Sequence, residues 1–113
     1  MIPGGVRIFV CLEPVDMRRG FDRLVQTARE RGGHDPTAGG MVVVFANRGA
    51  TRLKLLWFER NGVCVLYKRL HRAKFELPLA GAGSVSVHID GAQLAKLLAG
   101  VARDTPAAPK RSS

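Results

Sequence analysis

The stretch from Arg48 to Lys74 carries most of the positive charge of the chain. It contains eight basic residues and one acid, Glu59, a net charge of +7 out of +9 for all 113 residues. Its basic residues are Arg48, Arg52, Lys54, Arg60, Lys68, Arg69, Arg72 and Lys74, and its aromatic residues are Trp57, Phe58 and Tyr67. Cations at this density bind phosphate groups, and aromatic rings beside them stack on unpaired bases. The composition therefore predicts contact with a nucleic acid.

Solubility offers a simpler explanation of the same charge. Lysine and arginine on an exposed hairpin keep the edge of a sheet from pairing with other chains. That role does not require the cations to be gathered with a single acid among them, as they are here. The gathering of charge favours an anionic partner, most simply a phosphate backbone.

A β-hairpin is predicted to display these residues. Asn61-Gly62 separates two apolar runs rich in β-forming residues, which is typical of a type I′ turn with a positive φ at both central residues. This turn would place Lys54 opposite Arg69 and Phe58 opposite Val65. Like charges in opposite positions destabilise a sheet unless an anion lies over them.

The alternation of side chains along each strand divides the hairpin into two faces. One face would carry Arg52, Lys54, Phe58, Tyr67 and Arg69. The other would carry Leu53, Leu55, Trp57, Leu66 and Leu70, interrupted by Lys68. The first face is basic and aromatic, whereas the second is apolar.

Further strands are predicted on both sides of the hairpin. Residues 6–12 are short, apolar and partly β-branched, and residues 85–89 alternate like a half-buried strand. Residues 41–46 are apolar without alternation, which indicates a central strand covered on both faces. Residues 75–77 would add one more short strand, which Pro78 ends.

Two helices are predicted as well. Asp16 is expected to cap the first, whose apolar residues recur at helical spacing from Met17 to Ala28 and which ends at Gly32-Gly33. Asp90 and Gln93 form a capping box in front of the second, whose apolar stripe runs from Leu94 to Val101.

These elements predict an α+β fold in the order β-α-β-β-β followed by β-α. We expect a small, mostly antiparallel sheet with two helices packed on one side. Residues 1–101 are expected to form a single domain. Residues 102–113 lack large apolar side chains and contain Pro106 and Pro109, so a disordered basic tail is expected there.

Arg18 and Arg19 would lie in the first turn of the first helix. Cations at that position oppose the helix dipole, and residues that break a local preference often serve a function. The two arginines would then extend the basic surface of the hairpin. Alternatively, they are neutralised by nearby acids, which are Glu13, Asp16 and Asp22. The sequence leaves both possibilities open.

The chain is not expected to be an enzyme. A metal-dependent nuclease needs two or three carboxylates that converge on divalent cations. Asp16 and Asp90 are explained as helix caps, and no motif specifies a triad of Glu59, Glu76 and Asp16. The phosphate loop G-x-x-x-x-G-K-[ST] is absent from the sequence.

No cofactor, no metal and no membrane contact is expected. Cys11 and Cys64 lie inside apolar runs and are interpreted as small buried hydrophobes. The three histidines lack the spacing of zinc ligands. The sequence has neither a signal-peptide pattern nor an apolar stretch of about 18 residues, so we expect a cytoplasmic protein.

Three blocks of the sequence resemble a known family. They are PVDMRRGFDRL, MVVVFANRGATRLKLLWFERNGVCVLYKRLHRAKFELP and IDGAQLAKLL. The resemblance covers roughly residues 6–99. In this order they resemble the Orf2, or TnpB-type, accessory proteins of insertion sequences of the IS66 class. The resemblance implies a small protein that is encoded beside a separate transposase and supports movement of the element. It implies no catalytic residues, and the chain does not resemble the much longer RNA-guided nucleases also called TnpB.

The combined prediction is a non-catalytic accessory protein of an insertion sequence. It would support DNA transposition by binding DNA at the element ends, the transposase of the same element, or both, through the basic hairpin. The candidate nucleic-acid-binding residues are Arg48, Arg52, Lys54, Trp57, Tyr67, Lys68, Arg69, Arg72 and Lys74, together with Arg18 and Arg19. One alternative is a protein-interaction module for the transposase without DNA binding, which would need an exposed apolar patch including Trp57. Another is a small metal-dependent nuclease, which would need three converging carboxylates.

Overall fold

The computed structural model describes residues 5–79 and 81–102. In these ranges five strands form a main sheet, and two further strands form a separate ribbon. The strands of the main sheet are β1 (Arg7–Cys11), β2 (Met41–Ala46), β3 (Arg52–Glu59), β4 (Gly62–Arg69) and β6 (Ser86–Ile89). The helices are α1 (Phe21–Arg31), α2 (Gly91–Ala99) and a single turn of 3-10 helix (Pro36–Ala38), and the ribbon pairs β5 (Ala73–Lys74) with β7 (Val101–Ala102).

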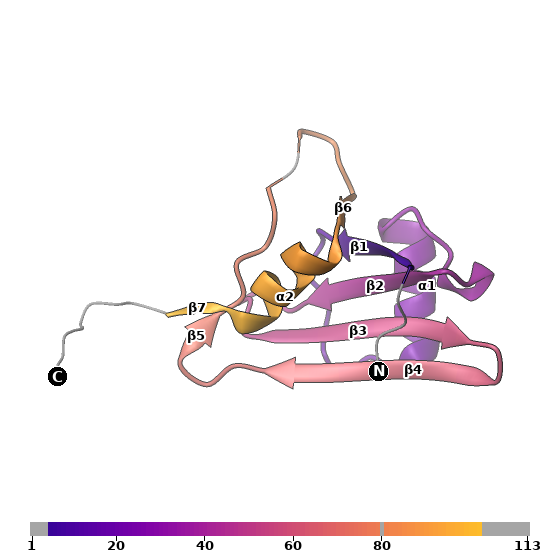
Figure 1. Cartoon of the computed structure of the whole chain (residues 1–113), viewed down its shortest axis with the longest axis horizontal. Helices are drawn as coiled ribbons and strands as arrows, with labels where there is room; N and C mark the ends of the chain where they lie inside the picture. Colours follow the sequence, from indigo (N-terminus) through magenta and orange to yellow (C-terminus); the bar gives the residue numbers. More distant parts are fainter. Residues whose placement is uncertain (1–4, 80, 103–113) are drawn as a thin grey trace, which may run out of the picture.

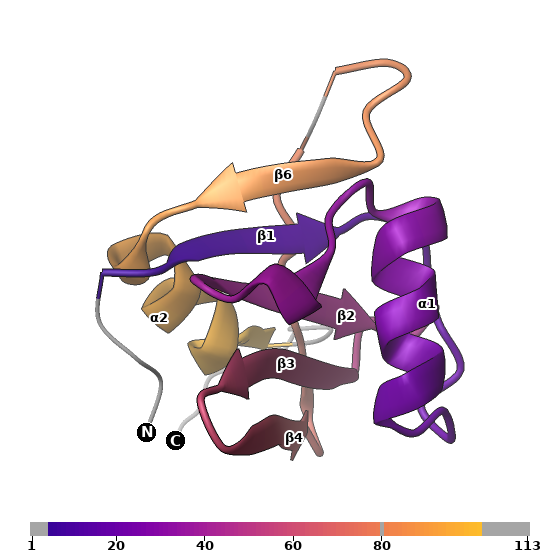
Figure 2. The ribbon, with the colours of Figure 1, turned by 90° about the vertical axis from the view of Figure 1, so that its right-hand side faces the viewer.

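The strands of the main sheet follow the order β4-β3-β2-β1-β6 (Figure 1; Figure 2). β1 and β2 are parallel and are connected through α1, whereas the other three pairs are antiparallel. The predicted α+β class and the order β-α-β-β-β then β-α are therefore confirmed. β2 is the middle strand, and all of its residues are buried, as its unbroken apolar sequence predicts.

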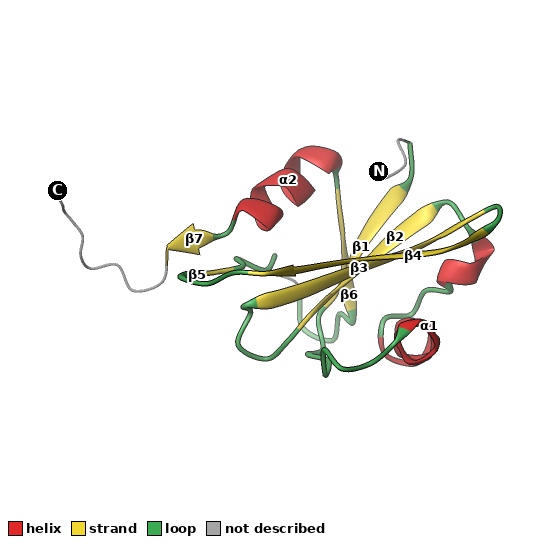
Figure 3. Ribbon diagram, turned by 90° about the horizontal axis from the view of Figure 1, so that it is seen from below, coloured by secondary structure: helices red, strands yellow, loops and turns green. Residues whose placement is uncertain are grey.

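The two helices lie on opposite faces of the main sheet (Figure 3). α1 buries Leu24 in a cluster that contains Phe45 on one face. α2 buries Leu94 and Leu97 in a cluster that contains Trp57 on the other face. The prediction that both helices pack on one side is wrong. The inner strands β1, β2 and β3 present apolar side chains on both faces, and a sheet of that kind needs cover on each.

Helix α1 begins later than predicted, at Phe21, with Gly20 in the N-cap position. The residues before it form an irregular segment that crosses from β1 toward the hairpin. The N–H of Val15 donates to the carbonyl of Ala46 (2.9 Å) and holds this segment against the end of β2. Met17 is buried although it lies outside the helix. Because Met17 has helical spacing to the apolar residues of α1, the predicted helix began too early.

The turn of the hairpin lies one residue earlier than predicted. Arg60 and Asn61 form the turn, and Glu59 pairs with Gly62 across it. None of residues 60–62 has a positive φ. The prediction of a type I′ turn at Asn61-Gly62 is therefore wrong, and each residue of β3 faces a partner two positions earlier in β4 than expected.

A shift of two residues preserves the two faces of the hairpin, because side chains alternate with a period of two. Lys54 lies opposite Tyr67, and Arg69 lies opposite Arg52. The pair of like charges is thus Arg52 with Arg69 rather than Lys54 with Arg69. The predicted apolar face is confirmed, since its five apolar residues all belong to the core on the α2 side.

The capping box at the start of α2 is present as predicted. The Asp90 carboxylate accepts from the N–H of Gln93 (2.7 Å), and the Gln93 side-chain oxygen accepts from the N–H of Asp90 (2.8 Å). The helix ends at Ala99. Val101 belongs to β7 and is half exposed, so it does not continue the apolar stripe of α2 as predicted.

One further strand, near the end of the described chain, lies at a different position from the one predicted. The short strand predicted at residues 75–77 lies instead at Ala73–Lys74, where it pairs with β7. The predicted disordered tail lies outside the described residues, apart from Ala102, whose backbone pairs with Ala73. Neither α-helix of the described ranges has the length and apolar character needed to span a bilayer.

Candidate nucleic-acid interface

Five cations gather at the open end of the hairpin, where β3 begins and β4 ends. Arg52 and Arg69 are direct cross-strand neighbours. Arg48 lies in the loop that leads into β3, and Arg72 and Lys74 lie in the segment that follows β4. We refer to Arg48, Arg52, Arg69, Arg72 and Lys74 as the basic end.

Hydrogen bonds fix the backbone of the basic end. The N–H of Leu70 donates to the carbonyl of Thr51 (2.8 Å), and the N–H of Phe75 donates to that of Ala50 (2.7 Å). Within the first loop, the side-chain oxygen of Asn47 accepts from the N–H of Thr51 (2.9 Å). Ala50 takes a left-handed conformation with φ of 56°. The two loops that carry Arg48 and Arg72 are therefore joined to one another.

The cations of the basic end have no acidic partner in the described part of the chain. None of the five side chains forms a hydrogen bond or an ion pair with another described residue. Four of them are exposed and Arg52 is partly buried. Because Arg52 and Arg69 repel one another, an anion bound between them would lower the energy of the pair.

Lys54 is engaged inside the protein. Its Nζ donates to the backbone carbonyl of Arg19 (2.9 Å) and lies 5.3 Å from the centre of the Tyr67 ring. A cation at that distance from an aromatic face is attracted by it. Lys54 therefore holds the segment before α1 against the hairpin, and we place it outside the basic end.

Lys68 is also engaged, on the opposite face of the hairpin. Its Nζ donates to the carbonyl of Leu98 in the last turn of α2 (2.8 Å). A cation there satisfies a carbonyl that has no partner within the helix and complements the helix dipole. Both central lysines of the hairpin thus have contacts that fix other elements of the fold.

Arg18 and Arg19 precede α1 and do not occupy its first turn. Asp16 does not cap the helix, whose N-cap is Gly20, and its carboxylate binds the Arg18 guanidinium (2.7 Å). This contact holds the pKa of Asp16 well below its usual range and raises the pKa of Arg18. Arg19 donates to the hydroxyl of Thr27 (2.7 Å), and its carbonyl binds Lys54. The segment therefore lies beside the basic face, and Asp16 neutralises Arg18.

Arg23 is a cation that the sequence analysis did not single out. It lies in α1 and lines a shallow hollow together with Asp16, Arg18, Arg19 and Gly20. The only sequence signal for it is its place four residues after Arg19 in the helix that was predicted to begin at Asp16.

The two aromatic candidates differ in their exposure. Trp57 is 5% exposed, and its indole N–H donates to the Glu59 carboxylate (3.2 Å). It cannot stack on a base, so its assignment as a nucleic-acid-binding residue is corrected. The exposed patch including Trp57 that an interaction module would need is likewise not formed. Tyr67 is 51% exposed and remains a candidate.

No group of three His, Cys, Asp or Glu side chains in the described residues is placed to hold a metal ion. Two carboxylates of the considered triad have other contacts, since Glu59 binds Trp57 and Asp16 binds Arg18. Cys11 is buried, as predicted, and its burial raises the pKa of the thiol, whereas Cys64 is only partly buried.

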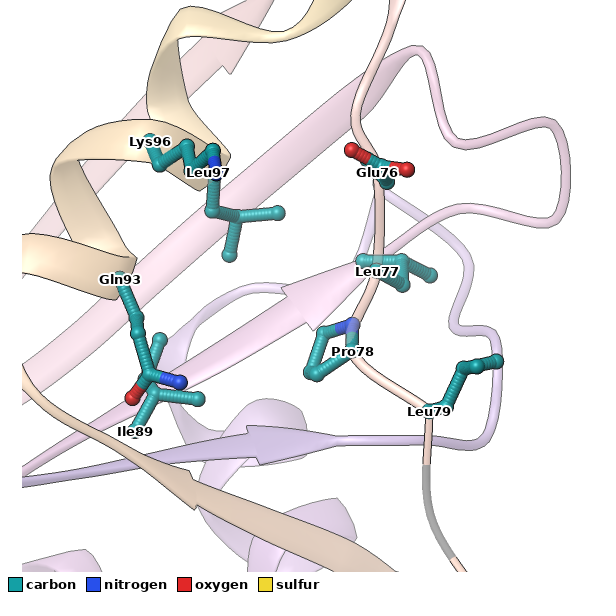
Figure 4. A pocket seen from close by; sticks show the side chains of 8 residues that line it. All are labelled: Glu76, Leu77, Pro78, Leu79, Ile89, Gln93, Lys96 and Leu97. Atoms are coloured by element: carbon teal, nitrogen blue, oxygen red, sulfur yellow. The ribbon is translucent and has the colours of Figure 1, made fainter.

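A groove of about 340 Å³ lies between residues 76–79 on one side and α2 with the end of β6 on the other (Figure 4). Its lining includes Leu77, Leu79 and Leu97, with Glu76 and Lys96 as its charged members. One acid and one cation give no net charge, so the groove lacks the positive potential that phosphate binding needs. The basic end is therefore the better candidate interface.

Comparisons with known proteins point to one family. The family described as "IS66 Orf2 like protein" matches residues 6–108. The chain is similar to two proteins of Sinorhizobium fredii (strain NBRC 101917 / NGR234), both described as uncharacterized. It is 36% identical to y4hO over 103 residues, which cover 89% of this chain and 87% of the relative. It is 32% identical to y4jC over 97 residues, which cover 86% and 80%. No solved structure matches.

Proposed function

Because the chain belongs to the IS66 Orf2-like family, whose members are accessory proteins of insertion sequences, we propose that it supports transposition by binding DNA through the basic end. In this proposal it performs no catalytic step. The DNA is that of the element ends, and the transposase of the same element is a second partner.

The observation that carries the proposal is the gathering of five cations on a fixed backbone, with no acidic partner among the residues that the structure describes. A phosphate between Arg52 and Arg69 would remove the repulsion of that cross-strand pair. Arg48 and Arg72 lie in the two loops that hydrogen bonds join to one another, and Lys74 follows in β5. In this proposal these residues contact phosphates of one strand.

In this proposal Tyr67 binds an unpaired base. It lies on the same face of the hairpin as Arg52 and Arg69, and about half of its surface is exposed. Stacking on an aromatic ring tolerates any base, so it contributes affinity without sequence preference. We therefore expect single-stranded or distorted DNA to bind at least as well as a regular duplex.

Titrations of fluorescent element-end DNA at several salt concentrations test the proposal. If each of the five cations neutralises one phosphate, log K should fall with log[salt] at a slope of about −3.5 for a single strand and about −4.5 for a duplex. Reversal of Arg69 and Arg72 to Glu should weaken binding and reduce the magnitude of the slope by about two.

The matched control reverses Arg60 and Lys96 to Glu. This variant has the same net charge, but Arg60 lies at the far turn of the hairpin and Lys96 lies on α2. Its affinity for DNA should stay closer to that of the parent. An equal loss in both variants would mean general attraction to a protein of net charge +9, and no loss in the first variant would refute the proposal.

A further inference from the structure

Strand β4 is a long edge of the main sheet. It pairs with β3 on one side, and no described segment pairs with its other side (Figure 2). It has eight residues, whereas β6 at the opposite edge has four. The outer backbone groups of an unpaired strand form a template for another strand.

The middle of β4 lacks the usual protection of an edge. Natural proteins place charges, prolines or bulges on long edge strands. Residues 63–67 (VCVLY) contain no charge, no proline and no glycine, and they pair with β3 in unbroken register. Val65 is 41% exposed and Tyr67 is 51% exposed. The two charged residues of the strand, Lys68 and Arg69, lie only at its end.

We propose that β4 is a dimer interface, at which a second copy of this chain adds its own β4 in antiparallel orientation across a two-fold axis. The argument for a second copy is that the strand is complementary to itself. With Val65 on the axis, Val63 of each copy lies opposite Tyr67 of the other, and the exposed apolar side chains cover one another. Such pairs of aromatic and β-branched residues stabilise a sheet.

The charges of β4 select the antiparallel orientation. In this register Lys68 of each copy lies opposite Gly62 of the other, and Arg69 lies opposite Asn61. An in-register parallel pair would instead place each lysine and each arginine beside its own copy, which like-charge repulsion disfavours. Gly62 has no side chain, so Lys68 of the second copy meets no charge there and keeps its contact with its own Leu98 carbonyl.

The geometry of the edges limits the assembly to two copies. A two-fold contact uses the same surface on both copies and leaves neither of the long edges free. The remaining edge, β6, is short. Strand pairing alone buries less surface than a standard protein interface, so we expect a dimer of micromolar affinity.

Light scattering coupled to size exclusion, with the full-length chain and no nucleic acid, tests the inference over a wide range of protein concentration. The parent should pass from monomer to dimer as its concentration rises. Added salt should favour the dimer, because it screens the repulsion between two copies of charge +9. Val65→Lys should remain folded but monomeric, because a charge at the centre of the edge would face a second charge.

Val101→Lys is the matched control, since Val101 is exposed to a similar extent (47%) and lies in β7. It adds the same charge and should dimerise like the parent. A parent that is monomeric at every concentration would overturn the inference, and so would a Val65→Lys variant that dimerises normally. A parent that is monomeric alone but pairs β4 with a strand of another protein would overturn it as well.

Hydrogen exchange of the parent provides a second measurement that needs no variant. Raising the protein concentration should slow exchange of alternate amides in β4, whose N–H groups point away from β3. Amides of β6 should be unaffected. If β4 exchanges at the same rate at low and high concentration, the dimer interface is elsewhere or absent. No DNA is present, so neither result bears on the phosphate contacts of the basic end, whereas a dimer would cover part of Tyr67 and compete with base stacking there.

Discussion

Lys54 and Arg52 illustrate how contacts, rather than charge alone, divide the cations of the hairpin. They are two residues apart on the same face of β3 and look equivalent in the sequence. Lys54 donates to the carbonyl of Arg19 and lies near the Tyr67 ring. Arg52 faces Arg69 and has no partner of opposite charge among the described residues. Lys54 therefore stabilises the fold, whereas Arg52 is available to an anionic ligand.

Charge reversal at these two positions should therefore have different effects on stability. Lys54→Glu should lower the free energy of unfolding by about 1–3 kcal/mol, because the Arg19 carbonyl loses its donor and a carboxylate faces it. Arg52→Glu should change it by less than about 0.5 kcal/mol, since it converts a like-charge pair into an opposite-charge pair with Arg69. Urea unfolding of both variants measures the difference. Equal destabilisation would contradict the structural role of Lys54.

His34 is a second residue whose environment alters its chemistry. Its ring stacks on Phe9, with 3.6 Å between the ring centres, and its Nε2 lies 3.2 Å from the hydroxyl of Ser86. Burial lowers the pKa of His34 from its ordinary value of 6.5, and the charge of Arg7 and the proximity of His88 lower it further. The folded protein thus binds this proton less readily than the unfolded chain does.

The stability of the protein should consequently decrease as the pH falls through about 6.5. Above that pH His34 is neutral in both the folded and the unfolded state, so it does not change the free energy of unfolding. As the pH falls, the unfolded chain binds the proton at a higher pH than the folded protein does, which favours unfolding. Asp35, whose pKa is lowered by Thr37 and Arg29, begins to lose its contribution only near pH 4. His34→Gln should flatten the dependence of unfolding free energy on pH between about 7 and 5. Unfolding curves with the same pH dependence in parent and variant would rule out His34 as the cause.

At the scale of the elements, Gly62 and Gly100 differ in whether their position tolerates a side chain. Gly62 begins β4 without a positive φ, and no atom lies within 4 Å of where a Cβ would be. Gly100 follows α2 with φ of +73°, and a Cβ there would lie 2.7 Å from Cδ1 of Leu70. The first tolerates a side chain, whereas the second connects α2 to the ribbon where none fits.

Gly62→Val should therefore change the free energy of unfolding by less than about 0.5 kcal/mol, or increase it slightly through the β propensity of valine. Gly100→Val should decrease it by more than about 1 kcal/mol, because valine resists a positive φ and meets Leu70. Thermal unfolding followed by circular dichroism compares the two. A large loss at Gly62 would imply a turn conformation other than the one described.

The elements differ in how far local sequence determines them. The faces of β3 and β4 follow from alternation, and the start of α2 follows from Asp90 and Gln93. Alternation does not determine the register of the hairpin, because a shift of two residues leaves the same side chains on each face. The start of α1 was not predicted correctly, because Met17 lies in a loop but is buried and has helical spacing to the apolar residues of α1. Which face a helix covers depends on the path of the chain, which no local pattern encodes.

The candidate site was predictable to a similar degree. The density of charge in residues 48–74 identified the hairpin as the basic element. Which of its cations are free depends on distant partners: Lys54 binds a residue 35 positions away, and Lys68 binds one 30 positions away. Burial of Trp57 likewise depends on α2 and the neighbouring strands. A linear sequence does not reveal contacts of this kind.

At the scale of the whole molecule, we propose that residues 1–101 form one domain, completed by the pairing of Ala102 in β7, which does not need the residues after Arg103. A chain that ends after Arg103 should keep the melting temperature of the full-length protein to within about 1 °C, because the segment removed contains no large apolar side chain. Its affinity for DNA should fall modestly at low salt, since Lys110 and Arg111 are lost. A marked drop in melting temperature would mean that the segment packs on the domain.

The position of β1 between β2 and β6 sets the order in which a nascent chain can complete this sheet. β1 leaves the ribosome first, yet its partners lie at Met41–Ala46 and Ser86–Ile89. The parallel pair and the hairpin can assemble during translation, while one side of β1 stays unpaired until β6 emerges. Ribosomes that stop before Ser86 would release a sheet with two open edges, at β1 and at β4. Arrival of β6, the last strand of the main sheet, thus closes one of the two edges at which another chain could pair.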